Sequence, residues 1–187
     1  SVLALNLSTR TITRILGGHP RAYVIPIAEK ILDAAEFSGS LYVLTETTIL
    51  KISDLDTEKP VTKRWLQTDD QLAPGAQRLW VDGSVYALSG DGSLATYYKG
   101  KRAATVQIPI SPSGTWRLLP GSDGLLAIAV GDARRIYLID PTTGDLIRTL
   151  KVDSQIPFTH VAPGSDGSVL LLTSEGKLWQ VSGGASR

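Results

Sequence analysis

An internal repeat constrains this chain more than any other feature. Four short runs rich in valine, leucine and isoleucine start at Ser40, Ser84, Leu125 and Ser168, with the sequences SLYVLTE, SVYALSG, LLAIAVG and SVLLLTS. Their starts lie 44, 41 and 43 residues apart. A steady interval of this length indicates that one supersecondary unit is copied along the chain and packs against its own copies.

Three further series of runs keep the same interval. One follows the first runs (ILKISD, LATYYK, IYLIDP and LWQVSG), a second comes after the next turn (TITRIL, VTKRWL, RAATVQI and DLIRTL), and a third precedes the first runs (AQRLWVDG, TWRLLPGSDG and FTHVAPGSDG). Runs of this length and composition are typical of strands. The breaks between them contain Asp-Gly pairs, which suit tight hairpins. Four short strands per repeat are the pattern of a β-propeller blade.

We therefore predict an all-β chain, a β-propeller of four-stranded antiparallel blades with about four repeats of 41–44 residues. A single domain would span 1–187, divided into a partial blade at 1–18, an insertion at 17–37, blades at about 36–68, 76–110 and 115–152, and a partial blade at 157–183. This division gives seventeen strands, one more than four blades need. Two explanations stay open: the chain is a fragment of a larger ring, or a second chain completes the ring. A β-sandwich is the alternative fold, but it does not require a steady period.

The stretches GSVYALSGDGSL and IYLIDPTTGDLIRTL resemble the repeats of the bacterial propeller superfamily that includes quinoprotein-type, YVTN-type and NHL-type blades. The resemblance extends over essentially the whole chain and implies a fold. Propellers of this type often form an accessory or extracytoplasmic domain of a larger bacterial protein. The resemblance implies the same role and location for this chain.

Composition excludes several classes of function. The net charge is +1, which gives no reason to expect nucleic acid or an anionic membrane surface as a partner. No window approaches the 18 or so apolar residues that a membrane-spanning helix needs. There is no cysteine and there are two histidines, so thiolate metal sites are excluded and a histidine-based one would need carboxylates from elsewhere. No nucleophile motif is present. We expect no catalytic residues, no metal and no cofactor.

The connections that lead from an outer strand to the next inner strand are the best functional lead, because they emerge on one face of a propeller. The first, at 17–37, is unusually long, and within it AEKILDAAEF is expected to form two or three helical turns. Arg21 and Tyr23 are candidate binding residues in this insertion. Asp69 and Asp70 are candidates in the second connection, although a solvated loop also explains them.

Two strand residues complete the candidate set. His160, in FTHVAPG, is placed where it could point into a central channel, although a structural histidine also explains it. Trp116 falls at a strand position comparable with those of Trp80 and Trp179, and core packing between blades explains all three. If Trp116 faces the channel mouth instead, it would supply an apolar anchor for a ligand.

We therefore expect a non-catalytic scaffolding module that binds a protein or peptide on one propeller face. Two alternatives stay open. One is a propeller enzyme, a hydrolase or a lyase, with its site at the channel mouth. The other is a structural module that assembles with itself through open blade edges, which also allows a homodimer.

Overall fold

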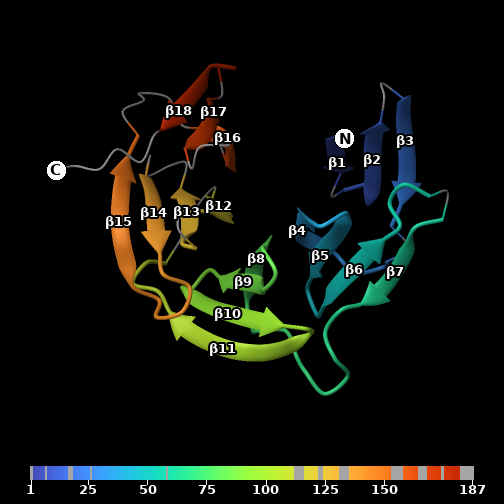
Figure 1. The fold of residues 1–187 in the computed structure, drawn as a ribbon, viewed down its shortest axis with the longest axis horizontal. Helices are drawn as coiled ribbons and strands as arrows, with labels where there is room; N and C mark the ends of the chain where they lie inside the picture. Colours follow the sequence, from blue (N-terminus) through green and yellow to red (C-terminus); the bar gives the residue numbers. More distant parts are fainter. Residues whose placement is uncertain are drawn as a thin grey trace. The chain divides into compact units, whose positions relative to one another are not determined.

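The structure, a computed structural model, describes the chain except for residues 1, 7, 17, 18, 26, 58, 112–115, 122–123, 131–134, 153–157, 164–167, 174 and 182–187. For 2–5, 14–16, 19–21 and 158–163 it describes the backbone alone. The described residues form eighteen strands and no helix (Figure 1). These strands are β1 Val2–Asn6, β2 Thr11–Leu16, β3 His19–Val24, β4 Ile31–Phe37, β5 Ser40–Thr45, β6 Ile49–Ser53, β7 Val61–Arg64, β8 Ala76–Val81, β9 Val85–Ser89, β10 Ser93–Tyr98, β11 Lys101–Gln107, β12 Trp116–Pro120, β13 Leu126–Val130, β14 Arg135–Ile139, β15 Leu146–Lys151, β16 Phe158–Pro163, β17 Val169–Thr173 and β18 Leu178–Val181.

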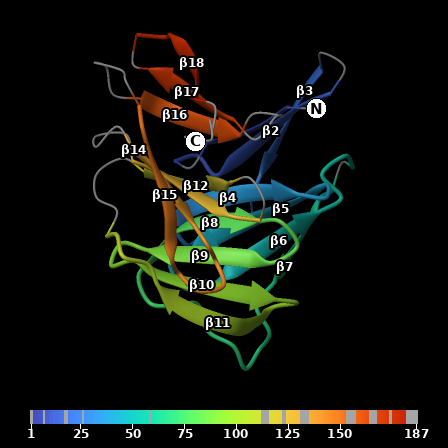
Figure 2. The same ribbon diagram turned by 60° about the vertical axis from the view of Figure 1, so that its left-hand side comes forward.

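The strands form five sheets in which neighbours along the chain are also neighbours in the sheet: β1–β3, β4–β7, β8–β11, β12–β15 and β16–β18. Figure 2 shows β8, β9, β10 and β11 side by side in this order. The predicted all-β class and its four-stranded antiparallel sheets are confirmed. The chain divides into two compact units, residues 1–89 with 95–103 (unit 1) and residues 90–94 with 104–187 (unit 2).

The four runs that define the repeat occupy the same place in their sheets. They form β5, β9, β13 and β17, each of which is the second strand of its sheet. The runs of the following series form the third strands, β6, β10, β14 and β18. The repeat in the sequence is therefore a repeat of one sheet.

In unit 1, strand β5 of the sheet β4–β7 is buried on both of its faces. All six of its residues are buried. Leu41 and Val43 join an apolar cluster with β2, whereas Tyr42 and Leu44 join another cluster with β8 and β9. Because successive side chains of a strand point to opposite faces, one continuous apolar run fills two interfaces. A sheet of this kind needs a neighbour on each side, which explains why the unit recurs.

Unit 2 shows the same alternation in β13, which is buried throughout. Ala127 and Ala129 belong to a cluster shared with β17. The intervening Leu126, Ile128 and Val130 lie on the opposite face and are also buried, at 6% exposure or less. Small residues on one face and large ones on the other still leave both faces of the sheet covered.

The helical turns expected within 17–37 are wrong, because Ile31–Phe37 is strand β4. It pairs with β5 from Ile31 opposite Thr45 to Phe37 opposite Ser40. Ile31 and Ala35 are 4% and 6% exposed and join different clusters, one on each face of the sheet. A surface helix buries one stripe, so burial on two opposite faces overrides the helix propensity of this alanine-rich segment.

Strand β3 was not among the seventeen expected strands. It pairs with β2, and Pro20 lies opposite Ile15 in that pairing. Proline argues against a central strand, but an edge strand tolerates it because one side of the strand needs no ladder partner. With β3 formed, the first outer-to-inner connection is reduced to residues 25–30.

Candidate functional site

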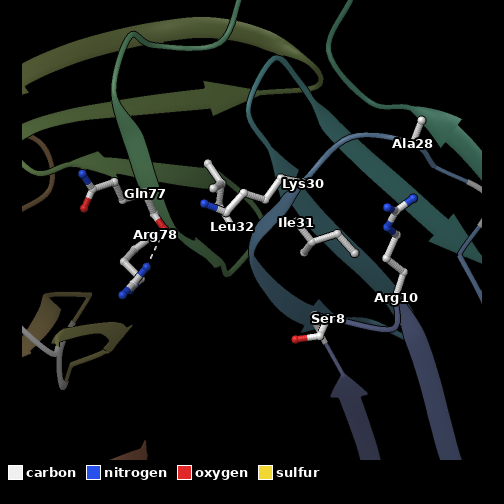
Figure 3. Close-up of a pocket in the computed structure, with 8 residues that line it drawn as sticks. All are labelled: Ser8, Arg10, Ala28, Lys30, Ile31, Leu32, Gln77 and Arg78. Carbon is white, nitrogen blue, oxygen red and sulfur yellow. Dashed lines mark hydrogen bonds between the residues drawn. The ribbon is translucent and has the colours of Figure 1, made fainter.

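Unit 1 contains a pocket of about 680 Å³. It is lined by parts of the β1–β2 turn, the β3–β4 connection and the first residues of β4 and β8, and these residues are Ser8, Arg10, Ala28, Lys30, Ile31, Leu32, Gln77 and Arg78 (Figure 3). Pockets that bind small ligands typically enclose roughly 300–1,000 Å³. The volume is therefore sufficient for a ligand.

The sheet topology explains why these segments meet. Strand direction alternates within each sheet, so the ends of β1 and β3 and the beginnings of β4 and β8 belong to the same edge. This is the edge from which the outer-to-inner connections leave. The pocket lies at the connection that the sequence indicates as a functional lead, although Tyr23, a candidate there, does not line it.

Three cationic side chains line the pocket: Arg10, Lys30 and Arg78. Arg10 Nη1 donates a hydrogen bond to the carbonyl of Ile27, and Arg78 Nη1 donates one of 2.9 Å to the carbonyl of Gln77. Lys30 is exposed and forms no hydrogen bond or ion pair with any residue that the structure describes. In the view of Figure 3, Arg10 and Arg78 lie at opposite ends of the group.

The nearby carboxylates bind other groups. Glu29 accepts hydrogen bonds from the hydroxyls of Thr45 and Thr47 at 2.5 and 2.7 Å. The Thr45 bond, followed by the Thr47 bond, lowers the pKa of Glu29 below its ordinary value of 4.5. Asp33 accepts a 3.0 Å hydrogen bond from the backbone N–H of Leu79. Neither acid lines the pocket, and none of its described lining residues is acidic.

Apolar side chains provide the rest of the surface. Ile31 is 4% exposed and also belongs to the cluster between β2 and the sheet β4–β7. Leu32, the next residue, packs against the cluster on the other face of that sheet. The lining of the pocket therefore combines apolar side chains with three cationic ones.

The second outer-to-inner connection, residues 65–75, has the equivalent topological position but holds its polar groups differently. Asp70 Oδ2 accepts a 2.7 Å hydrogen bond from the backbone N–H of Arg102 in the β10–β11 hairpin, and its Oδ1 accepts one from Gln71 N–H at 3.0 Å. The Arg102 guanidinium donates to the Gln71 carbonyl at 2.7 Å. These bonds tie the connection to the hairpin of the next sheet.

A close backbone approach completes this tie. The N–H of Gln67 donates to the carbonyl of Gly100 at 2.9 Å, and a Cβ added at Gly100 would lie 2.4 Å from the carbonyl oxygen of Trp65. In the protein interior, the hydroxyl of Tyr97 accepts a 2.6 Å hydrogen bond from the N–H of Ala73, a residue of the second connection. The second connection is therefore a structural clamp.

Four of the six candidate residues from the sequence lie elsewhere. Asp70 is part of the clamp, and Asp69 is exposed and forms no hydrogen bond or ion pair within the described part of the chain. The Tyr23 hydroxyl lies 3.3 Å from the Thr62 hydroxyl, between β3 and β7. Trp116 is 2% exposed. None of these four lines the pocket.

The other two candidates have described backbones only. Arg21 pairs with Arg14 in the β2–β3 ladder, and His160 pairs with Leu172 in the β16–β17 ladder. Their side chains lie outside the described residues. The prediction that they bind a ligand stays a prediction.

The three tryptophans differ more than their sequence contexts suggested. Trp116 is buried and Trp80 packs against the cluster between β4–β7 and β8–β10, as core packing requires. Trp179 is 42% exposed on β18, so the prediction of core packing is wrong for this residue. It lies in a third strand, whereas the other two lie in first strands.

Sequence reasoning missed Arg10, Lys30 and Arg78, because they are far apart in the chain and none belongs to a motif. One signal was available. Each of the three lies within a few residues of the start of a strand at the same edge of the sheets: β2, β4 and β8.

The described residues contain neither a metal-binding cluster nor a membrane-spanning helix. No group of three or more His, Asp or Glu side chains there is arranged to hold a metal ion. The same part of the chain contains no helix that is long and apolar enough to cross a membrane.

No protein-family model matches the chain, and no curated protein matches it. Solved structures do. Glutaminyl cyclase from Myxococcus xanthus is 16% identical, with 92% of this chain and 81% of that chain covered and a TM-score of 0.63. A catalytically inactive virginiamycin B lyase from Staphylococcus aureus is 14% identical, with 96% and 68% covered and a TM-score of 0.61.

The WD40 β-propeller domain of Doa1 is 18% identical, with 95% of this chain and 59% of that chain covered and a TM-score of 0.59. At these identities the likeness concerns the fold alone. This likeness agrees with the repeated sheets described above, in which β5 and β13 are buried on both faces. The chain therefore has a β-propeller fold.

Proposed function

We propose that this chain is a non-catalytic module that binds a segment of a protein or peptide in the pocket of unit 1. The observation that carries the proposal is the pocket itself, with about 680 Å³ at the outer-to-inner edge of the sheets. An apolar wall beside cationic groups suits a peptide, which offers both apolar side chains and polar backbone. Binding groups on connections held by a rigid scaffold are the common arrangement in repeat folds.

An enzyme is the alternative that the fold leaves open, since two of the similar structures are a cyclase and a lyase. The chemistry of the pocket favours binding. Among the described lining residues, Ser8 is the one that carries a hydroxyl group. None of the other described lining residues is a histidine or an acid that could activate this hydroxyl as a nucleophile. Nucleophilic or general acid–base catalysis needs such a partner within hydrogen-bonding distance.

The proposal is tested with an array of immobilised short peptides of random sequence, probed with the labelled chain and with two variants. Ala28→Trp fills the pocket from an exposed position, so it should remove most of the specific signals without unfolding the chain. Ala103→Trp, at an exposed position of β11, is the matched control and should bind like the unsubstituted chain. Equal binding by all three proteins would overturn the proposal.

One observation favours self-assembly as a second candidate. Leu178 and Trp179 of β18 are 69% and 42% exposed, whereas the equivalent third strands β6, β10 and β14 are mostly buried. Within the described residues β18 pairs with β17 alone. An exposed apolar edge can accept a strand from a second copy. Light-scattering mass should then show a dimer that Trp179→Lys abolishes, and a monomer at every concentration would exclude this candidate.

A further inference from the structure

We infer that Glu29 is a positioning residue of the unit 1 pocket, which holds the rim residues Ala28 and Lys30 in the arrangement that a ligand meets. The inference rests on the proposed function, because it states how the same site is kept ready for its ligand. It follows from the hydrogen bonds of Glu29, from the packing of its partners and from the bonding of the residues beside it.

The β3–β4 connection is anchored at both ends of the rim. Before the rim, Arg10 Nη1 donates a hydrogen bond to the carbonyl of Ile27, whose side chain packs against the cluster that contains Ile31. After the rim, Ile31 begins strand β4 and is 4% exposed. Residues 28–30 therefore span the distance between two anchored isoleucines.

Within this span, Glu29 is the residue that is bonded to the rest of unit 1. Its Oε2 accepts hydrogen bonds from the hydroxyls of Thr45 and Thr47, at 2.5 and 2.7 Å. Ala28 and Lys30, which precede and follow it, line the pocket (Figure 3). Neither of these two residues forms a hydrogen bond with any residue that the structure describes. The position of the rim therefore depends on the Glu29 carboxylate.

The partners of Glu29 belong to a well-packed part of unit 1. Thr45 is the last residue of β5 and is fully buried. Its Oγ1 also accepts hydrogen bonds from the backbone N–H groups of Thr47 and Thr48, at 3.3 and 3.0 Å, within the β5–β6 turn. Hydrogen bonds to a carboxylate are shorter and stronger than neutral ones. Glu29 therefore takes its position from the sheet β4–β7.

The ionisation of Glu29 depends on the same bonds. The hydroxyl of Thr45, followed by that of Thr47, lowers the pKa of Glu29 from 4.5. Its interactions are with these two threonines and not with another ionisable group. The ionisable residues on the elements around it are Arg10, Lys30, Asp33, Glu46 and Arg78. A protonated carboxyl has less acceptor capacity, so the rim should loosen as the pH falls below 4.5.

A fixed rim matters for affinity. When a site populates several arrangements, the apparent affinity falls in proportion to the fraction of molecules in the arrangement that binds. Loss of the Glu29 bonds should therefore weaken peptide binding. It should cost little global stability, because a short connection can open locally while the sheets stay folded.

The first test measures the mobility of the rim without a ligand. The chain contains no cysteine, so a nitroxide attached through Ala28→Cys reports on this position alone in electron paramagnetic resonance. Adding Glu29→Ala or Thr47→Val should increase the mobility of the nitroxide, whereas Thr47→Ser keeps the hydroxyl and should not. Glu46→Ala, at an exposed position of the same turn, is the control and should have no effect. Equal mobility with and without Glu29 would overturn the inference.

The pH dependence separates the carboxylate from a general loss of structure. As the pH falls below 4.5, the nitroxide at the rim should gain mobility, and adding Glu29→Gln should remove this step. A nitroxide attached through Ala103→Cys, at an exposed position of β11, should show no step in either protein. A step that persists with Glu29→Gln would mean that another acid holds the rim, and the inference would then be wrong.

The second test measures binding of one array peptide that has no charged side chain and whose signal Ala28→Trp removes. In fluorescence anisotropy, Glu29→Ala should weaken its binding roughly three- to tenfold, and Glu46→Ala should not change it. If Ala28→Trp abolishes binding while Glu29→Ala leaves it unchanged, the pocket binds peptides but Glu29 does not position it. If Ala28→Trp changes no peptide on the array, the proposed function fails and the inference fails with it. The effect of Ala28→Trp therefore distinguishes the two failures.

Discussion

Two connections in unit 1 occupy the same topological position but differ in the contacts that their polar groups make. The β3–β4 connection, residues 25–30, leaves Lys30 without a partner among the described residues and lines a pocket. The β7–β8 connection, residues 65–75, bonds to the β10–β11 hairpin through Asp70 and Gln67. A polar connection therefore does not by itself indicate a binding site. What matters is whether the neighbouring sheet already satisfies its polar groups.

The clamp at the second connection depends on how closely the hairpin approaches it. Lys99 and Gly100 both have positive φ, at 50° and 81°, as a two-residue hairpin turn requires. The absence of a side chain at Gly100 lets the turn lie against the carbonyl of Trp65. A side chain at position 100 should therefore disrupt the clamp.

Gly100→Ala should have the largest effect. The new Cβ would meet the backbone oxygen of Trp65 at 2.4 Å, and the position has a left-handed φ. Backbone strain and overpacking each cost roughly 1–3 kcal/mol, so we expect a loss of about 2–5 kcal/mol in the free energy of unfolding. Urea denaturation measures it.

Gly39→Ala is the matched control for this substitution. Gly39 has a φ of +73°, close to that of Gly100, but nothing lies within 4 Å of its added Cβ. Gly39→Ala therefore introduces a similar backbone strain but no steric clash of the new Cβ. If Gly100→Ala and Gly39→Ala lose the same unfolding free energy, the close approach of Gly100 to Trp65 does not contribute to the stability of the clamp.

Tyr97→Phe should have the next largest effect. Its hydroxyl accepts the N–H of Ala73 at 2.6 Å, and Tyr97 is fully buried. The change leaves a buried N–H without an acceptor, which costs about 1–3 kcal/mol. Tyr98→Phe, at a side chain that is 54% exposed, is the control and should be neutral in the same denaturation experiment.

Asp70→Ala should cost less, about 0.5–1.5 kcal/mol, because the bonds to Arg102 and Gln71 are exposed to water. Asp69→Ala should leave stability unchanged, since Asp69 is exposed and has no partner among the described residues. Neither variant should alter binding to the peptide array. A loss of binding with either one would show that the second connection takes part in recognition.

The repeat could be predicted from the sequence alone, and strands β5 and β13 show why. Runs buried on both faces keep their apolar residues in every copy, so their interval can be read directly. Strand β4 could not be read in this way. Its alanines suit a helix, and only the two clusters that contain Ile31 and Ala35 make it a strand.

The site was harder to predict than the fold. Asp70 and Lys30 both stand in polar connections, and local sequence does not distinguish a charged residue with a partner from one without. The partner of Asp70, the backbone of Arg102, is 32 residues away. The pocket at Lys30 likewise depends on the β8 residues Gln77 and Arg78, which come close through sheet packing.

Substitution of Glu29 should have the smallest effect. Glu29 holds the first connection to the end of β5 and the β5–β6 turn by accepting hydrogen bonds from Thr45 and Thr47. Its pKa is lowered from 4.5 by the hydroxyls of Thr45 and Thr47, so the folded state favours the carboxylate. A group whose pKa is lower in the folded state contributes stability above its unfolded value, and this contribution is lost as the pH falls through the folded value. The unsubstituted chain should therefore lose more unfolding free energy between neutral pH and pH values below 4.5 than Glu29→Gln does. Glu46→Gln, at an exposed position of the adjacent turn, should follow the unsubstituted chain. If the unfolding free energies of the unsubstituted chain and of Glu29→Gln depend on pH in the same way, the Glu29 carboxylate does not stabilise the β3–β4 connection.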